Sequence, residues 1–418
     1  MAALAPEVKL REVWAWSMYD FANSAYTTVV ITAVFGAYFV GVVAEGQPWA
    51  TFAWTAALSV SYAAILLTGP LLGAWADAHA AKKPLLLAST VGCVIFTAAL
   101  YGAAPGAIAL SLALLVVSNY FFGAGENLIA AFLPELASSG AMGRVSGWGW
   151  SFGYLGGLAA LGICLFYITA SGKPATETVP VTMLITAAFF AIAAAPTFLF
   201  LRERAVPQPR MENPWARVRR TLSEAQKYQD LKRFLICLLF YQAGITAVVA
   251  LAAIYAEQAM KFTMQQTIVL ILVVNVTAAV GAFGFGYLQD AIGHVRAVAL
   301  TLAGWIAMVL IAGFSQTAGS FWLAANLAGL CMGSAQAAGR AVVGYLAPPA
   351  RLAEFFGLWG LAVKAASIFG PLTYGAVTWI FAGNHRLGIF ATGVYFVIGL
   401  VLLRGIDIER GRTAALAP

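Results

Sequence analysis

Charged residues are scarce in this chain: they make up 10% of its 418 residues, while hydrophobic residues make up 61%. A soluble domain carries about 25% charged residues, so the composition excludes an ordinary soluble protein. Cysteine and histidine are also rare, with four and three copies, and no pair has the spacing of a metal or redox site. No nucleophile–base set or phosphate-binding loop is present. We therefore expect a multi-pass membrane protein that is not an enzyme and has no cofactor, metal or nucleic-acid partner.

Twelve apolar segments are long enough to cross a bilayer, which takes about 20 helical residues. They cover residues 13–40, 50–77, 84–104, 107–136, 145–170, 180–201, 234–258, 265–289, 296–315, 319–346, 354–382 and 386–404. The first segment is too long for a cleaved signal peptide, so we expect it to be retained. The pattern predicts an all-α membrane protein with twelve transmembrane helices.

The basic residues are distributed unevenly between the two sides of these segments. Nineteen of them lie in loops and helix ends on the side of the termini, and only Lys173, Lys261 and Arg386 lie on the other side. Because basic loops stay in the cytoplasm, both termini are predicted to be cytoplasmic. The location that we expect is the cell membrane, the inner membrane in a bacterium.

One long polar segment, residues 202–233, divides the chain into an N-terminal bundle (1–201) and a C-terminal bundle (234–418). It carries nine basic and four acidic residues. Its simplest interpretation is a solvated linker that enforces the topology, and adhesion to anionic lipid headgroups is the alternative. Within it, Trp215 to Tyr228 is a candidate surface helix.

The two bundles share a motif at the cytoplasmic end of their second helix. In the first, Gly73 and Asp77 precede the basic pair Lys82 and Lys83. In the second, the corresponding residues are Gly286, Asp290 and Arg296. Two six-helix halves in the same orientation are typical of transporters whose halves rock about a central site. We therefore expect two pseudo-symmetric six-helix bundles, and the motif residues are candidates for a gate.

The first apolar segment carries a polar stripe. Asp20, Asn23, Ser24, Thr27 and Thr28 fall on one side of a helix drawn at 100° per residue. A carboxylate facing lipid costs several kcal/mol, so the stripe must face protein or water. Two interpretations stay open, a polar contact between helices and the wall of a substrate path.

Four stretches of the sequence resemble motifs of a known family. The Gly73–Asp77 motif resembles the signature of the major facilitator superfamily, and Tyr19–Tyr26 resembles the first-helix signature of its vacuole-effluxer-like family. Ala131–Leu136 and Gln336–Pro371 are similar to that family's helix 4 end and helix 10–11 region. The resemblance implies the major facilitator fold and solute transport, with helices 1, 4, 7 and 10 around a cavity. Fungal members are linked to amino-acid efflux from vacuoles.

The chain departs from the family at helix 7. The family usually has a Tyr-Asn-Asp-Gly-like stretch there, and this chain has Tyr241-Gln-Ala-Gly244. Any mechanism that uses an acid at that position is therefore in doubt. The resemblance also implies that Asp77 anchors the gate by accepting hydrogen bonds at the start of helix 11, near Glu354 and Phe355, where the helix dipole favours an anion.

Four charges lie inside the predicted spans. At 1.5 Å per residue, Asp20 and Arg340 lie roughly 10 Å from the cytoplasmic end, and Glu126 and Lys364 lie roughly 15 Å from it. Each pair has one member in each half, so each is a candidate ion pair. Such a pair is either permanent, or it breaks and reforms as the halves rock. Gln336 shares a helix face with Arg340.

Different roles suit the different charges. Glu126, the deeper acid, is the better candidate for a proton carrier, since burial favours the neutral carboxyl group. Asp20 is the better candidate for a gate. Arg340 and Lys364 are alternatively candidates to hold the carboxylate of an anionic or zwitterionic solute.

The sequence predicts a secondary active transporter of a small polar organic solute, such as an amino-acid-like one, with proton coupling. We expect its partners to be the solute, the lipid bilayer and protons, and we expect a monomer. Two alternatives are an exporter of amphipathic compounds and a non-transporting membrane sensor or scaffold.

Overall fold

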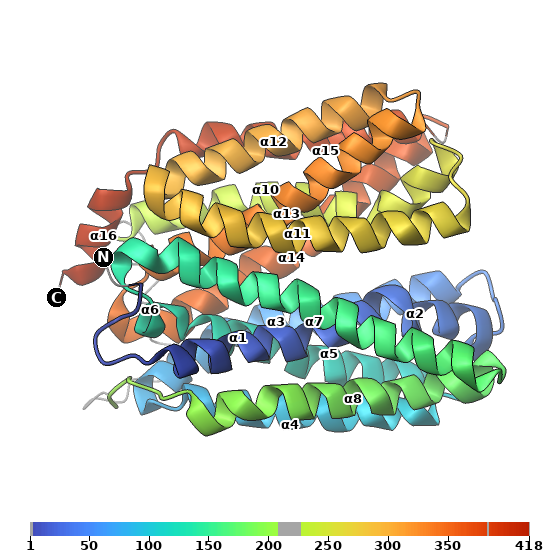
Figure 1. The fold of residues 1–418 in the computed structure, drawn as a ribbon, viewed down its shortest axis with the longest axis horizontal. Coiled ribbons are helices and arrows are strands. Elements are labelled where there is room, and N and C mark those ends of the chain that lie inside the picture. The colour runs from blue at the N-terminus through green and yellow to red at the C-terminus, as the bar shows by residue number, and fades with distance from the viewer. Residues whose placement is uncertain (1–2, 208–226, 383, 418) are drawn as a thin grey trace.

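The computed structural model describes residues 3–207, 227–382 and 384–417. Its long helices run side by side in two groups, one made by α1–α8 and the other by α10–α15 (Figure 1). The predicted all-helical class is confirmed. Most of Trp215 to Tyr228, the candidate surface helix, lies outside the described residues.

The first half is built from six spanning segments and a short helix. They are α1 Leu10–Ala25 with its continuation to Val43, α3 Ala50–His79, α4 Lys82–Ala99, α5 Ile108–Ala130, α6 Leu133–Leu136, α7 Met142–Ser171 and α8 Ala175–Phe200. The second half has six long helices and a short C-terminal one. They are α10 Gln229–Gln258, α11 Met264–Ile292, α12 His294–Phe314, α13 Ala318–Leu346, α14 Leu352–Ile380, α15 His385–Leu403 and α16 Ile408–Leu416.

Eleven of these segments are apolar and long enough to cross a membrane in the described part of the chain. The remaining long helix, α13, has 29 residues and is less apolar because glycine, alanine and polar residues fill it. Those small residues suit close packing against neighbouring helices in lipid. With α13, the described residues make up the predicted twelve-helix architecture.

The first spanning segment is not one continuous α-helix. After α1 it changes to a π-helix (Tyr26–Ala33), then to a short α2 (Phe35–Tyr38) and to a second π-helix (Phe39–Val43). The sequence predicted a single regular helix over 13–40, and this is corrected. A π-helix has more residues per turn than an α-helix, so it rotates the faces of all later residues.

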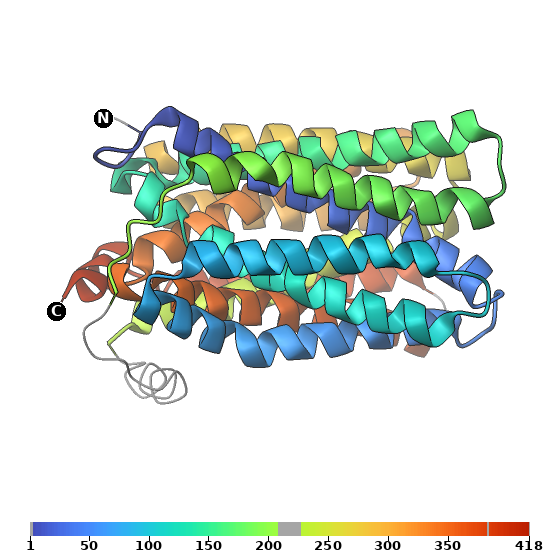
Figure 2. The same ribbon diagram turned by 90° about the horizontal axis from the view of Figure 1, so that it is seen from below.

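Both termini lie at the same end of the molecule (Figure 1). The connection between α7 and α8 lies at the opposite end in both views (Figures 1 and 2). This arrangement agrees with the prediction that the termini share one side of the membrane. We call the end that carries the termini the terminal end.

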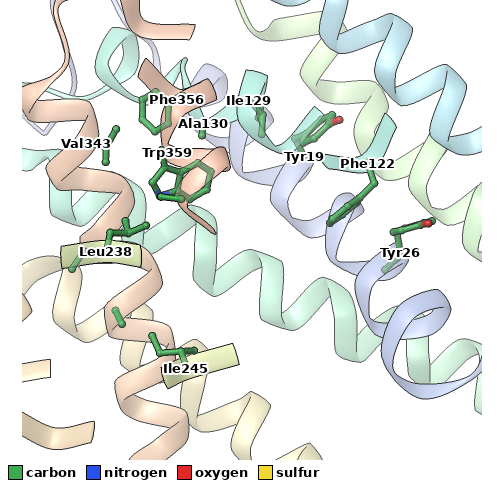
Figure 3. Close-up of a cluster of buried hydrophobic side chains, with 14 of the residues drawn as sticks. Tyr19, Tyr26, Phe122, Ile129, Ala130, Leu238, Ile245, Val343, Phe356 and Trp359 are labelled. Atoms are coloured by element: carbon green, nitrogen blue, oxygen red, sulfur yellow. The ribbon is translucent and has the colours of Figure 1, made fainter. Parts of the chain in front are cut away.

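The two halves contact each other along α3 with α14 and α7 with α11. Glycines allow this approach: a Cβ on Gly357 would lie 2.7 Å from the backbone oxygen of Gly69, and one on Gly286 would lie 2.7 Å from that of Gly143. Figure 3 shows apolar side chains of the two halves near this interface, among them Phe356 and Trp359. Only small residues let the backbones approach so closely.

Candidate functional site

Two ion pairs join the halves inside the molecule. Arg340 of α13 donates a 2.7 Å hydrogen bond to Asp20 of α1, and Lys364 of α14 donates a 2.9 Å hydrogen bond to Glu126 of α5. Both contacts were expected from the equal depths of the partners. Among the described residues, the hydrogen bonds and ion pairs between the halves extend from the terminal end to the level of Lys364.

Arg340 is surrounded by groups of the opposite half. Its Nε donates to Ser146 Oγ at 3.1 Å, and Nη2 donates to the Ser146 carbonyl oxygen at 2.9 Å. The guanidinium lies 4.6 Å from the Trp16 ring and 5.4 Å from the Trp150 ring. Because a guanidinium is a flat fork of donors, it can use its edge for hydrogen bonds and its faces for the rings. Arg340 thus ties α13 to α1 and α7.

Lys364 is held more loosely. Its ammonium lies 5.5 Å from the Tyr62 ring and 5.6 Å from the Phe122 ring, and Glu126 is its one hydrogen-bond partner among the described residues. The Glu126 side chain is 20% exposed, compared with 11% for Asp20. A lysine ammonium has three N–H donors, so part of its hydrogen-bonding capacity is unused here.

The polar stripe of the first helix is divided between two environments. Ser24 faces Gly153 of α7, where a Cβ would lie 3.0 Å from the serine Oγ, and Thr28 faces Gly157 in the same way. Asp20 faces Gly149 one turn earlier on the same glycine row. This part of the stripe is therefore a polar contact between helices of one half, one of the two alternatives that the sequence left open.

The other two stripe residues lie elsewhere. Thr27 is exposed. Asn23 is buried, and its Oδ1 has no hydrogen-bond partner among the described residues. On α13, Gln336 is partly exposed and its side chain makes no hydrogen bond to a described residue, whereas Gly333 lies against the backbone of Ala278. Only part of the face that carries Arg340 is therefore available to a solute.

The two motif aspartates make equivalent contacts across the interface. Asp77 accepts hydrogen bonds from the backbone N–H groups of Ala353 and Glu354 at 3.0 and 2.9 Å. Asp290 accepts them from Gly143 and Arg144 at 2.9 and 3.1 Å. Each carboxylate lies at the N-terminal end of a helix in the opposite half, where the helix dipole favours an anion. For Asp77 this is the contact that the resemblance implied.

The glycines of the motif are positioned at the same interface, but its basic residues are not. A side chain on Gly73 would clash with the backbone at Ala353 and Glu354. Lys82 instead pairs with Glu135 of its own half, and Lys83 donates to the Leu201 carbonyl oxygen at 2.6 Å.

The basic residue of the second copy of the motif also lies away from the contact between the halves. Arg296 is exposed and has no partner among the described residues. The sequence grouped these basic residues with the gate, and the structure does not bring them to the contact between halves.

Some residues of the site were missed by the sequence analysis. Ser146, Trp150 and Tyr62 are ordinary membrane-helix residues in sequence, and their roles depend on which helices meet. Glu135 lies near the end of an apolar segment, where the sequence alone is consistent with a capped surface residue. Its side chain is 10% exposed and pairs with Lys82, and it also accepts a 2.9 Å hydrogen bond from the Arg204 backbone.

Glu12, Glu135 and Glu203 attach the start of the central segment to the first half. Arg204 donates to both oxygens of Glu12, at 3.1 and 2.9 Å, and Glu203 accepts from the backbone of Lys82 at 2.8 Å. The segment therefore packs on the first bundle before the described part of the chain is interrupted. The division of the chain at 202–233 remains a prediction.

Comparisons with known proteins agree with this architecture. A family model described as "Vacuole effluxer Atg22 like" matches residues 38–416. An uncharacterized MFS-type transporter of Bacillus subtilis is 28% identical over 94% of each chain. Autophagy-related protein 22-1 of Neosartorya fischeri is 25% identical over 66% of this chain, and the match spans 49% of the fungal protein.

The crystal structure of the human organic anion transporter MFSD10 superposes with a TM-score of 0.74, at 18% identity, and covers 94% of this chain and 99% of its own. That likeness shows the fold. The chain is therefore a secondary transporter of the major facilitator superfamily and not an enzyme. It belongs to the Atg22-like vacuole effluxer family.

Proposed function

We propose that the chain moves a small polar organic solute of amino-acid-like chemistry by alternating access, and that Glu126 carries a coupling proton. The observation that supports this most directly is the Glu126–Lys364 pair. It joins the two halves, it is partly open to water, and each partner has a single hydrogen bond among the described residues. A pair of this kind can break when the halves separate.

Alternating access needs contacts at one end that hold the halves together and can be released. The carboxylates of Asp77 and Asp290, and the Arg340–Asp20 pair, make such contacts at the terminal end. All of them are polar and therefore become hydrated when that end opens. The cost of breaking them is then partly offset by water, which suits a reversible gate.

The test compares two activities of Glu126→Gln in proteoliposomes. Exchange of labelled solute for unlabelled solute needs no net proton movement, whereas accumulation driven by a pH gradient does. A proton carrier changed to glutamine keeps exchange and loses pH-driven accumulation. Full accumulation by Glu126→Gln would refute proton coupling at this residue. Equal loss of both activities, with a lower melting temperature, would make the pair with Lys364 structural.

We further propose that both termini are cytoplasmic, in the cell membrane. The excess of basic residues at the terminal end supports this orientation. Impermeant thiol reagents applied to intact cells should label a single cysteine that replaces Lys173, at the α7–α8 connection, and should not label one placed near either terminus. Labelling in the opposite pattern would contradict the orientation.

A further inference from the structure

The surroundings of the Lys364 ammonium are those of a binding site for an organic cation. Glu126 supplies a carboxylate at 2.9 Å, and the centroids of the Tyr62 and Phe122 rings lie at 5.5 and 5.6 Å. All three groups belong to the first half, whereas the lysine belongs to the second. A carboxylate with aromatic faces is the arrangement by which proteins recognise ammonium ligands.

The Phe122 ring of this arrangement is held in place without the lysine. The Phe122 ring stacks on Tyr26 with centroids 4.9 Å apart and planes 23° apart, as Figure 3 shows for these two side chains. Tyr26 in turn exchanges a 2.8 Å hydrogen bond with Ser118. A Cβ on Gly123 would clash with Ile65 Cδ1 and would lie 3.5 Å from Lys364 Cε, so the lysine stem passes at ordinary contact distance from this glycine. The Phe122 ring is held by groups of its own half and therefore persists when α14 moves away.

We infer that Glu126, Tyr62 and Phe122 form a subsite for the ammonium group of the transported solute, and that Lys364 fills this subsite as a tethered substitute when no solute is bound. The inference rests on the proposed function and adds the residues that bind the ammonium group of the solute. An ammonium that enters the subsite takes over the hydrogen bond to Glu126 and the two aromatic faces. The displaced lysine then carries an uncompensated charge.

This balance of charge favours a zwitterion. A solute that carries a carboxylate beside its ammonium pairs with Glu126 through one group and with the displaced Lys364 through the other. A simple amine leaves Lys364 unpaired, and a simple carboxylate cannot replace the lysine at Glu126. Leaving one member of a buried ion pair without a partner is costly, so both of these should bind less well.

The subsite can be tested without any transport assay. Lys364→Ala should lower the melting temperature of the purified protein, because Glu126 loses its partner. Added n-propylammonium, which reproduces the atoms that the substitution removes, should restore most of that loss in a saturable manner, since a ligand that binds only the folded state stabilises it. Propionate and n-propanol at the same concentration should not. The matched control is Arg340→Ala, where Asp20 has lost its partner but the surrounding groups, Ser146 and the Trp16 and Trp150 rings, contacted a flat guanidinium, so n-propylammonium should give no recovery.

Two further variants make the result specific. Lys364→Ala combined with Glu126→Gln should lose the recovery, and Lys364→Ala combined with Tyr62→Leu should need a higher concentration of n-propylammonium. No saturable recovery in Lys364→Ala, or equal recovery in Arg340→Ala, would overturn the inference.

Wild-type protein provides the second measurement if Lys364→Ala cannot be purified. A small zwitterionic amino acid should raise its melting temperature more than n-propylammonium or propionate does. An equal or larger effect of propionate would overturn the inference. Recovery of Lys364→Ala without any solute exchange by the wild type would leave the subsite intact and refute the proposed function. Solute exchange by the wild type without recovery of Lys364→Ala would refute the subsite and leave the proposed function intact.

Discussion

The two buried ion pairs differ in how completely their cations are held. All three nitrogens of the Arg340 guanidinium donate hydrogen bonds, and two indole rings lie near it, at 4.6 and 5.4 Å. Lys364 donates one hydrogen bond, and its two neighbouring rings lie farther away, at 5.5 and 5.6 Å. The side chains of the arginine and the lysine are 3% and 9% exposed.

From this difference we propose that the two pairs have different functions. The Arg340 pair is nearer the terminal end, and each nitrogen of its guanidinium already donates to a group of the opposite half, so it acts as a latch between the halves. The Lys364 pair lies deeper, its Glu126 side chain is 20% exposed and one hydrogen bond holds the ammonium, so it suits a site that a solute or a proton occupies. The number of protein partners around each cation distinguishes the two pairs.

The comparison predicts the largest effect for removal of the arginine. Arg340→Ala leaves the Asp20 carboxylate buried and unpaired, which costs about 3–5 kcal/mol. It should abolish solute exchange and strongly lower the melting temperature, whereas Lys364→Ala should cost less stability because Glu126 has access to water. Thermal unfolding of both variants in the same detergent measures the difference. Equal losses of melting temperature in the two variants would show that the two ion pairs do not differ in their contribution to stability.

Exchange of the charges provides the next test. The sequence alone predicts that Asp20→Arg with Arg340→Asp recovers part of the activity. The structure changes this expectation, because an aspartate at 340 would face the Ser146 carbonyl oxygen and the arginine at 20 would lack the fork of acceptors. Glu126→Lys with Lys364→Glu should instead recover the melting temperature, because one contact carries the pair, but not solute exchange, because Glu126 also binds the ammonium group of the solute. Melting temperature and solute exchange are both measured, with the four single variants as controls. Recovery of the first pair alone would contradict this interpretation.

The ion pairs could be predicted from the sequence for a simple physical reason. Charges inside a membrane span need partners, and the distance to the helix end gives their depth. The hydrogen bonds of Asp77 were instead implied by the family resemblance, and the preference of a helix N-terminus for an anion gives their physical reason.

Other features of the site depend on information that the sequence does not carry. No residue in the first segment marks the change to a π-helix, so the face of Thr27 could not be assigned. Trp150 and Tyr62 are two of many aromatic residues in apolar segments, and only the crossing of helices brings them to a cation. Lys82 sits in the gate motif, but its partner Glu135 lies at the end of another helix.

A smaller effect is expected from the glycine row of α7. A methyl group on Gly149 would clash with Asp20, Arg340 and Trp16, whereas Gly162 on the same helix has no atom within 4 Å of its Cβ position. Gly149→Ala should weaken the latch and increase modification of a cysteine placed at the terminal-end interface. Gly162→Ala should be neutral or stabilising by about 1 kcal/mol, because alanine favours helix more than glycine does. Equal cysteine modification in the two variants would show that the row does not support the latch.

The smallest effects should come from single polar groups around each cation. Ser146→Ala removes one acceptor of Arg340 and the hydroxyl bonded to the Ala337 carbonyl oxygen, but it keeps the backbone acceptor. It should cost about 1 kcal/mol of stability, as expected for one neutral hydrogen bond. Tyr62→Phe keeps the ring that faces Lys364 and removes a hydroxyl that contributes no hydrogen bond to the pair, so stability and solute exchange should stay unchanged. Thermal unfolding and exchange of the two variants test whether the latch depends on its hydrogen bonds and the deeper site on its aromatic faces. A larger loss in Tyr62→Phe than in Ser146→Ala would reverse that assignment.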